Sequence, residues 1–302
     1  MTLRRAGFVD LPAHRSAGGF DHAAVHQGRR RLFVAHTAND AVDVISLDRD
    51  EYIGSIEGLP GVAGALVSDE LDLVFTSNRA ADAVSVISAD DHRVVSTIQV
   101  GSRPNGLALD ETRGTLLVAG VGEPYTLTIV DVDRAVAMAS IPAPGRTRWA
   151  VHDPRSGVFF VNIADPPEIV VIDAARPDTV ARTIPIDFAG PHGLDLDTDV
   201  RLFCACDEGR LLFLDPPSYE SVGDVALAGA PDVIFLDQVL GRVYVAIGDP
   251  GLVQVVDVLD RSIDETVATE LGAHTLALDP ARHRVYVFLP MTHRAVILED
   301  SA

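Results

Sequence analysis

The sequence predicts an all-β protein, a seven-bladed β-propeller with four antiparallel strands in each blade. Three observations predict it: a strand-like segment that recurs seven times, a second apolar strand about twelve residues after each copy, and chain ends that complement each other. Four short strands every 40-odd residues are typical of propeller blades. A helical solenoid would need apolar residues at helical spacing, which these short, β-branched segments lack.

The recurring segment is apolar and is bounded by Gly, Pro, Asp or Asn. Its seven copies read RLFVAH, LDLVFTS, TLLVAG, GVFFVN, RLFCAC, RVYVAI and RVYVFL. Successive copies are separated by 41, 43, 42, 44, 41 and 42 residues, measured between Phe33, Val74, Leu117, Phe159, Phe203, Tyr244 and Tyr286. Seven copies predict seven blades.

The two chain ends predict how the ring closes. The last copy stops at AVILED, before a fourth strand, while the N-terminal LRRAGFVDLPA resembles the fourth strands YIGSIEGLPG and SVGDVALAGA. We therefore expect the N-terminal strand to complete the last blade, which leaves few exposed sheet edges. The predicted single domain covers residues 1–302, with blades at about 18–59, 60–101, 102–145, 146–190, 191–230, 231–272, and 273–302 plus 3–12.

Composition limits the classes of partner. The chain has 302 residues, 47% of them hydrophobic, and a formal net charge of −20, which disfavours nucleic acid and anionic membrane surfaces. It lacks both the apolar stretch of a signal peptide and a run of 18 apolar residues, so we expect a soluble, cytoplasmic protein and no membrane partner. Its two cysteines, Cys204 and Cys206, are too close to link distant segments, as suits a reducing compartment. The sequence leaves the oligomeric state open.

The repeat resembles the YVTN family of seven-bladed β-propellers, which includes YncE-like proteins, over essentially the whole chain. VFTSN at residues 74–78 is the closest local match to the namesake tetrapeptide, and RVYVAI and RVYVFL keep its first half. The resemblance implies the fold. It implies no single function, because such propellers include lactonases, a streptogramin lyase, redox enzymes and surface-layer modules. No active-site motif of the family matches this sequence, so no residue role is carried over.

One position in each repeat is the strongest candidate for function. Segments such as GPHGLDLD and RPNGLALD lead into the first strand of a blade, and in a propeller these loops surround the channel mouth, where ligands bind on a rigid scaffold. We call these the entrance positions: Asp21, Ala63, Asn105, Arg148, His192, Asp232 and His274. The residues leaving the second strand open on the same face: His36, Ser77, Gly120, Asn162, Cys206, Ile247 and Leu289, flanked by Asn78, Arg79, Asp207 and Glu208.

Two kinds of site are predicted at the mouth. Nitrogen and oxygen donors on neighbouring blades suit Zn²⁺, Mn²⁺ or Fe²⁺ better than Ca²⁺, and the predicted ligands are His192, Asp232, His274, Asp21 and His22. Across the mouth, Arg148 and Trp149 would clamp an anionic or planar group. The predicted catalytic residues are His192, His274 and Arg148, and the predicted substrate-binding residues are Asn105, Trp149, His36, Asn78, Asn162 and Asp207.

Two functional hypotheses follow. The first is an enzyme that acts on a small anionic molecule at the channel mouth, as a metal-assisted lactonase or esterase-like hydrolase or as a lyase. The alternative is a non-catalytic propeller that binds a ligand or protein, with mouth side chains that bond mainly to loop backbone. The sequence has no GxSxG, Walker, GxGxxG or HExxH motif, hence no nucleotide or flavin signature. The histidines expected in connecting loops, with structural or solvated roles, are His14, His26, His92, His152 and His283.

Overall fold

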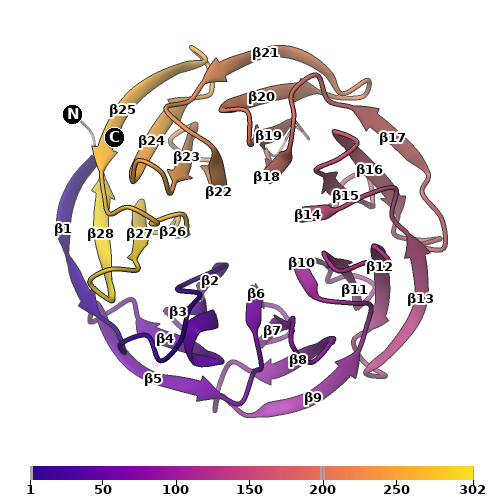
Figure 1. The fold of residues 1–302 in the computed structure, drawn as a ribbon, viewed down its shortest axis with the longest axis horizontal. Coiled ribbons are helices and arrows are strands. Elements are labelled where there is room, and N and C mark those ends of the chain that lie inside the picture. Colours follow the sequence, from indigo (N-terminus) through magenta and orange to yellow (C-terminus); the bar gives the residue numbers. More distant parts are fainter. Residues whose placement is uncertain (1–2, 198, 200, 302) are drawn as a thin grey trace.

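A computed structural model describes residues 3–197, 199 and 201–301, which form seven four-stranded antiparallel sheets arranged in a ring (Figure 1). The predicted fold class is confirmed. The first strand of each blade lies nearest the centre of the ring, and the fourth strand lies at the outer rim. Residues 1, 2, 198, 200 and 302, which the predicted domain includes, lie outside the described residues.

The blades follow one another along the chain. Blade 1 comprises β2 (Ala23–His26), β3 (Arg31–His36), β4 (Ala41–Ser46) and β5 (Glu51–Glu57). Blade 2 comprises β6 (Val62–Ser68), β7 (Leu73–Asn78), β8 (Ala83–Ser88) and β9 (Val94–Gln99). Blade 3 comprises β10 (Pro104–Asp110), β11 (Thr115–Gly120), β12 (Thr126–Asp131) and β13 (Val136–Pro142). Blade 4 comprises β14 (Thr147–Asp153), β15 (Val158–Ile163), β16 (Glu168–Asp173) and β17 (Arg182–Pro185).

The remaining blades complete the ring. Blade 5 comprises β18 (Pro191–Leu196), β19 (Leu202–Cys206), β20 (Arg210–Asp215) and β21 (Glu220–Ala226). Blade 6 comprises β22 (Pro231–Asp237), β23 (Arg242–Ile247), β24 (Leu252–Asp257) and β25 (Ser262–Ala268). Blade 7 comprises β26 (Leu276–Asp279), β27 (Arg284–Leu289), β28 (Arg294–Asp300) and β1 (Leu3–Asp10).

Closure of the ring occurs as predicted. Strand β1 pairs antiparallel with β28, with Leu3 opposite Asp300 and Asp10 opposite Arg294. The two ends of the chain therefore meet on one blade (Figure 1). Tyr244 of blade 6 donates a hydrogen bond to the Asp300 carboxylate at 2.7 Å, and Tyr286 of blade 7 donates one to Asp50 of blade 1 at 2.8 Å. These bonds tie the closing blade to both of its neighbours.

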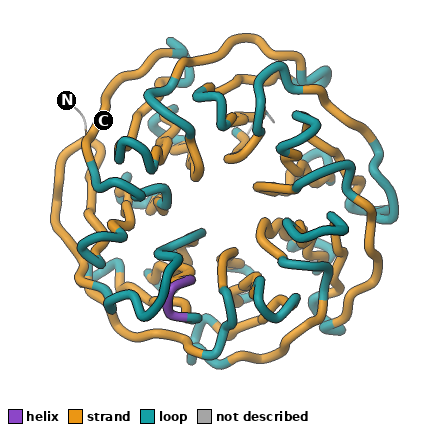
Figure 2. Tube along the Cα trace, viewed as in Figure 1, coloured by secondary structure: helices purple, strands orange, loops and turns teal. Residues whose placement is uncertain are grey.

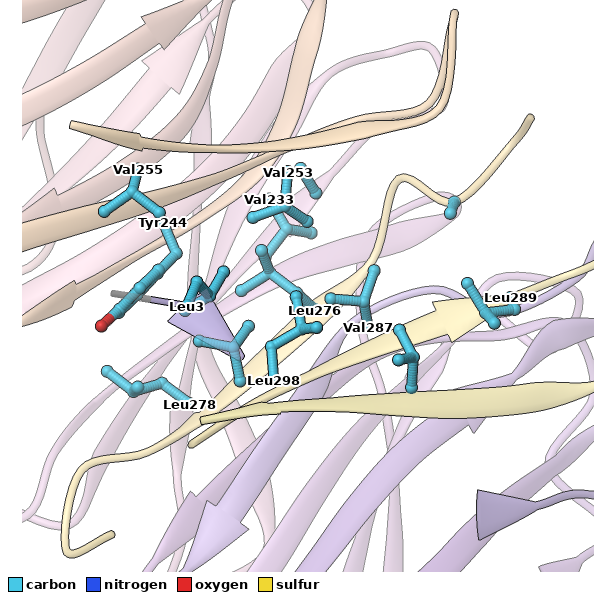
Figure 3. Close-up of a cluster of buried hydrophobic side chains, with 14 residues drawn as sticks. Leu3, Val233, Tyr244, Val253, Val255, Leu276, Leu278, Val287, Leu289 and Leu298 are labelled. Carbon is cyan, nitrogen blue, oxygen red and sulfur yellow. The ribbon is translucent and has the colours of Figure 1, made fainter. Parts of the chain in front are cut away.

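The core lies between the blades. Second strands such as β19 are buried along their whole length because both faces of the sheet are covered by adjacent blades, which explains their unbroken apolar sequence. Figure 3 shows one such cluster, where Tyr244 and Val253 of blade 6 pack with Leu276, Leu298 and Leu3 of blade 7. Fourth strands such as β13 are mostly exposed, with only Ile141 buried and Ala139 half-buried, because they lie at the solvent-facing rim.

The loops at one face determine where a ligand can bind. The loop into each first strand and the loop between the second and third strands lie at the same end of the blade, since the strands are antiparallel. One of these loops contains the 3₁₀ turn η1 (Thr37–Asn39), the short helical segment in Figure 2. No helix within residues 3–197, 199 and 201–301 has the length and apolar character needed to cross a membrane.

Candidate functional site at the channel mouth

The entrance positions coincide with irregularities in the strand pairing. In blades 2 to 6, each entrance residue is the second residue of the first strand and lies where the register with the second strand shifts. A β-bulge re-aims side chains locally and recurs next to functional sites. Pro191 and Gly193 lie at this irregularity, and His192 between them is the residue whose side chain the bulge directs.

The glycine after the entrance residue is required by close packing between blades. A Cβ on Gly193 would lie 2.4 Å from the carbonyl oxygen of Asp232 in blade 6, and one on Gly106 would lie 2.4 Å from that of Arg148 in blade 4. The first strands approach so closely here that only a hydrogen fits between them. Entrance side chains of neighbouring blades are therefore held at a short, fixed separation.

Residues that leave the second strand support the entrance backbone of the next blade. Asn162 donates its amide hydrogens to the carbonyl oxygens of His192 at 2.9 Å and Gly193 at 3.1 Å, and its side chain is fully buried. The Ser77 hydroxyl donates to the Asn105 carbonyl at 2.8 Å. Asn78, also buried, donates to the Ser85 hydroxyl at 2.8 Å within its own blade. The side-chain amides of Asn162 and Asn78, both predicted to bind substrate, therefore donate hydrogen bonds to other groups of the protein.

His192 lies between two carboxylates. Its Nδ1 is 2.7 Å from Asp207 Oδ1 of its own blade, and its Nε2 is 3.2 Å from Asp232 Oδ1 of blade 6. Burial alone would lower the pKa of His192, but the charge of Asp232 and the hydrogen bonds to both carboxylates outweigh burial and raise it to about 9. Burial favours protonation of Asp232, yet His192 holds the pKa of that carboxyl well below its usual value. The pair is ionic at neutral pH.

Arg148 extends toward this pair from blade 4 without a close partner. Its Nη2 is 3.4 Å from Asp207 Oδ2, and its Nη1 is 3.4 Å from His192 Nε2, which is itself cationic at neutral pH. Both contacts are long for charged hydrogen bonds. The Nε atom is buried and has no hydrogen-bond partner within the described part of the chain. Burial and the positive charge of Arg146 lower the pKa of this guanidinium, and the negative charge of Asp207 offsets only part of that shift.

A second cluster joins blades 1, 2 and 3. Arg79 Nη1 is 3.1 Å from Asp21 Oδ2, and Arg79 Nη2 donates to the side-chain oxygen of Asn105. The positive charge of Arg79 also acts on Arg148, which places the two clusters within electrostatic reach of each other. The sequence alignment placed Arg79 among the residues that flank the mouth but assigned it no binding role. It follows the last residue of a second strand, as Asp207 does, and this shared position is the sequence signal that identifies it.

Trp149 and His22 lie below the mouth, inside the channel. Their rings, from blades 4 and 1, are 4.0 Å apart between centroids, and Phe235 of blade 6 meets Trp149 at 6.2 Å in an edge-on contact. All three line a cavity of about 620 Å³ inside the channel, whereas Arg148 and His192 do not. The predicted clamp of Arg148 and Trp149 is therefore divided between two places: the guanidinium belongs to the mouth and the indole belongs to the cavity.

The remaining predicted residues have closer partners than the His192 pair, although the charge of His274 also acts on Asp232. The Nδ1 of His274 bonds to the Gly272 carbonyl at 2.8 Å. His36 is fully buried, and its Nδ1 is 2.7 Å from Asp43. Two histidines expected in connecting loops instead lie in strands: His26 is the last residue of β2, and His152 is the residue before the last in β14.

Four of the five predicted metal ligands form two pairs: His22 Nε2 lies 3.5 Å from Asp21 Oδ1, and His192 Nε2 lies 3.2 Å from Asp232 Oδ1. Asp21 also pairs with Arg79, His22 packs on Trp149, His274 bonds to backbone, and Nδ1 of His192 faces Asp207. A protonated imidazole has no lone pair for a metal ion. Within the described residues, no group of three or more His, Cys, Asp or Glu side chains is arranged to hold a metal ion. Binding of Zn²⁺, Mn²⁺ or Fe²⁺ at this mouth stays a prediction.

The two cysteines are buried behind the mouth. Cys204 and Cys206 face the same side of β19, with sulfur atoms 4.0 Å apart, and both side chains are fully buried. The Cys204 thiol also contacts the Asn162 side-chain oxygen at 3.6 Å. Hydrogen bonding to Cys206 and burial raise the pKa of Cys204 well above its ordinary value, so this thiol stays protonated and packs as a small apolar group.

Comparison with known proteins shows the fold alone. No protein-family model matches the chain, and neither does any curated protein sequence. Among solved structures, a chain of the hydrazine synthase of Kuenenia stuttgartiensis is similar with 14% identity and a TM-score of 0.82, covering 97% of each chain. A chain in the crystal structure of the mitotic checkpoint complex is similar with 10% identity and a TM-score of 0.84, covering 99% of this chain and 92% of that one.

Proposed function

We propose that the protein binds a small anionic molecule at the channel mouth, on the donors of Arg148, Arg79 and His192. The observation that carries the proposal is the position of Arg148, a largely buried cation whose polar contacts are both 3.4 Å long and which lies beside a second cation. A guanidinium with unused donors matches a carboxylate or phosphate group in geometry and charge. We also propose that the chain is related to the YVTN family. This relationship accounts for the scaffold and assigns no site residue.

The surrounding charge strengthens the proposal. The chain as a whole has a net charge of −20, so a group of cations at the channel mouth is a local departure from the acidic surface. Asp207 and Asp232 offset the charges of His192 and Arg148, and Asp21 offsets that of Arg79, while Arg146 adds a further positive charge that acts on Arg148. An anion of one or two charges would replace the long contacts of Arg148 with short ones and relieve its repulsion with Arg79 and His192.

The test is calorimetric titration with acetate, succinate, citrate and inorganic phosphate. We expect saturable binding of at least one of these anions at one site, weakened about tenfold or more by Arg148→Gln, because a hydrogen bond to a charged group contributes roughly 1.5–3 kcal/mol. Arg93→Gln is the matched control, since it removes one positive charge at a side chain that is 84% exposed and lies away from the mouth. Equal binding by Arg148→Gln and the wild type would contradict the proposal.

A second candidate function is acid catalysis, and the two carboxylates around His192 favour it. They keep the imidazole protonated at neutral pH, so it would donate a proton to a leaving oxygen while Arg148 holds an anionic substrate. This is the hydrolase or lyase chemistry of the predicted enzyme, without the metal. A panel of lactones, esters and β-substituted carboxylates should show turnover in the wild type that His192→Gln lowers about 100-fold or more. Turnover that His192→Gln leaves unchanged would exclude this role.

A further inference from the structure

A cavity of about 620 Å³ lies inside the channel, on the opposite side of the aromatic pair from the mouth. At one end it meets His22, Trp149 and Phe235. At the other it reaches the turns that connect first to second strands, where Glu70 and Glu111 lie. Its volume falls within the range of about 300–1,000 Å³ that is typical of small-molecule sites. The mouth residues Arg148 and His192 do not line it.

The walls of the cavity are apolar and include many small side chains. Most of the lining comes from alanine, leucine and valine on the first strands of blades 1 to 5: Ala23, Ala24, Ala65, Leu66, Val67, Leu107, Ala108, Leu109, Ala150, Val151, Leu194 and Leu196. The cavity stays open because several wall positions carry alanine, which is smaller than the leucine and valine at neighbouring positions. Such walls favour an apolar body in the bound molecule, since each CH₂ removed from water contributes about 0.8 kcal/mol.

The polar groups of the cavity are acidic or neutral. The two oxygens of Asp195 each accept a backbone N–H at 2.8 Å, from Leu196 and Leu236, so this carboxyl is already bonded. His152 has a side chain only 8% exposed, and its Nε2 lies 3.7 Å from Asp110, beyond hydrogen-bond distance. Burial, its largest influence, lowers the pKa of His152, so the ring is neutral at pH 7. Its Nε2 has no hydrogen-bond partner among the described residues.

The open end is negatively charged. Glu70 and Glu111 are exposed at the rim, and Glu111 Oε1 accepts a hydrogen bond from the Ser68 hydroxyl. Of the described residues that line the cavity, none is a lysine or arginine, so the rim carboxylates have no cation at the cavity itself. An apolar interior with carboxylates at its opening is complementary to a molecule with an apolar tail and a positive head.

We propose that the channel cavity is a second binding site, separate from the mouth, for a small amphiphilic amine: an apolar tail packs between the first strands against Trp149, and the ammonium group lies between Glu70 and Glu111. The neutral ring of His152 offers a hydrogen-bonding nitrogen to the same molecule once the ring turns from Asp110. This site does not depend on anion binding at the mouth, because the two share no residue and the Trp149–His22 pair lies between them.

The chain contains its own reporter for this site. Trp149 is the only tryptophan of the sequence, so intrinsic fluorescence reports on the cavity. The titrants are octylamine, octanoate, octanol and ethylamine, which separate the charge of the head from the apolar tail. We expect a saturable change in Trp149 fluorescence with octylamine, binding about fivefold or more weaker for octanol, and no saturation with octanoate or ethylamine.

Variants localise the binding. Ala24→Phe, at a partly exposed wall position, should abolish octylamine binding by filling the cavity. Glu70→Gln combined with Glu111→Gln should weaken it about fivefold. The control pair, Glu51→Gln with Glu57→Gln, removes two exposed carboxylates from the outer strand β5 and should change nothing. Arg148→Gln should also leave amine binding unchanged, which separates this site from the mouth.

The proposal would be overturned by no saturable signal with octylamine, by equal affinity for octylamine and octanoate, or by full binding in the Ala24→Phe variant. Because Ala24→Phe could disturb folding, its circular dichroism and melting temperature are compared with those of the wild type. The glutamine variants change only exposed side chains, so they provide an independent test. Amine affinity that is equal in the Glu70→Gln, Glu111→Gln pair and in the control pair would also overturn it.

Discussion

The mouth and the cavity are two regions of one channel and are built from the same first strands. They differ in how their charged side chains are paired. At the mouth, charged residues of neighbouring blades pair with one another, as His192 does with Asp207 and Asp232. In the cavity, most of the lining is apolar, and none of the described residues that line it beside Glu70 and Glu111 is a lysine or arginine. The difference teaches that a repeat determines where side chains point, while the residue chosen at each copy decides whether they bind each other or a ligand.

The largest expected effect is at the boundary between the two regions. Trp149 packs against two hydrophobic clusters and against His22, so Trp149→Ala should lower the free energy of unfolding by about 3–4 kcal/mol. Urea denaturation followed by circular dichroism measures this loss. Leu259→Ala is the control, since Leu259 is 86% exposed and its removal should cost less than about 0.5 kcal/mol. A loss below about 1 kcal/mol for Trp149→Ala would show that the aromatic pair does not hold the two regions apart.

The next effect distinguishes the mouth by its response to pH. The pKa of His192 is raised from 6.5 to about 9, so its stabilising contribution is complete below pH 6.5 and is lost as the pH rises through 9. The free energy of unfolding should therefore fall, on the order of 2–3 kcal/mol, between about pH 6 and about pH 9.5. His192→Gln should remove this part of the pH dependence. Identical pH profiles for the two proteins would show that the ionic pair does not stabilise the mouth.

A smaller effect tests how tightly the mouth is built. Gly193→Ala places a Cβ about 2.4 Å from the backbone oxygen of Asp232, which a side-chain movement cannot relieve, so stability should fall by about 2 kcal/mol. Gly7→Ala is the matched control in a strand, where the new Cβ would meet only the side chain of Ile297 at 3.8 Å. Thermal denaturation compares the two. A Gly193→Ala variant as stable as Gly7→Ala would contradict the close approach of blades 5 and 6.

The smallest effect is expected at the rim of the cavity. Glu70 is exposed and belongs to no salt bridge among the described residues, so Glu70→Gln should change the free energy of unfolding by less than about 0.5 kcal/mol. Urea denaturation with Glu51→Gln as a second exposed variant measures it. A destabilisation of 1 kcal/mol or more would mean that the rim, like the mouth, is held by its own charges.

Much of the architecture could be predicted from the sequence because it depends on local periodicity. The seven copies around Phe33 and its equivalents predict seven blades, and the similarity of residues 3–12 to fourth strands predicts the closure that β1 and β28 show. The fold, in other words, follows from alternation and spacing. The same alignment also places Arg148, His192 and Asp232 side by side on neighbouring blades, as the structure shows.

The pairing within the mouth could not be predicted in the same way. Arg79 lies two residues beyond the aligned position Ser77, and nothing in its own segment shows that it reaches Asp21 and Asn105 on two other blades. His22 and Trp149 occupy the equivalent repeat position in blades 1 and 4, one residue after the entrance position, but their contact crosses the channel. Such contacts depend on side-chain length and channel width, which a linear alignment does not contain.

The sequence by itself determined the number of blades, the closure of the ring and the set of residues at the entrance of each first strand, because these follow from hydrophobic periodicity along the chain. Only the tertiary structure decided that His192 is held between Asp207 and Asp232 as a cation, that Asp21 pairs with Arg79, and that a separate apolar cavity lies beneath Trp149. The physical reason is distance: charge pairing, pKa and cavity volume are set by residues that the ring brings together from blades far apart in sequence.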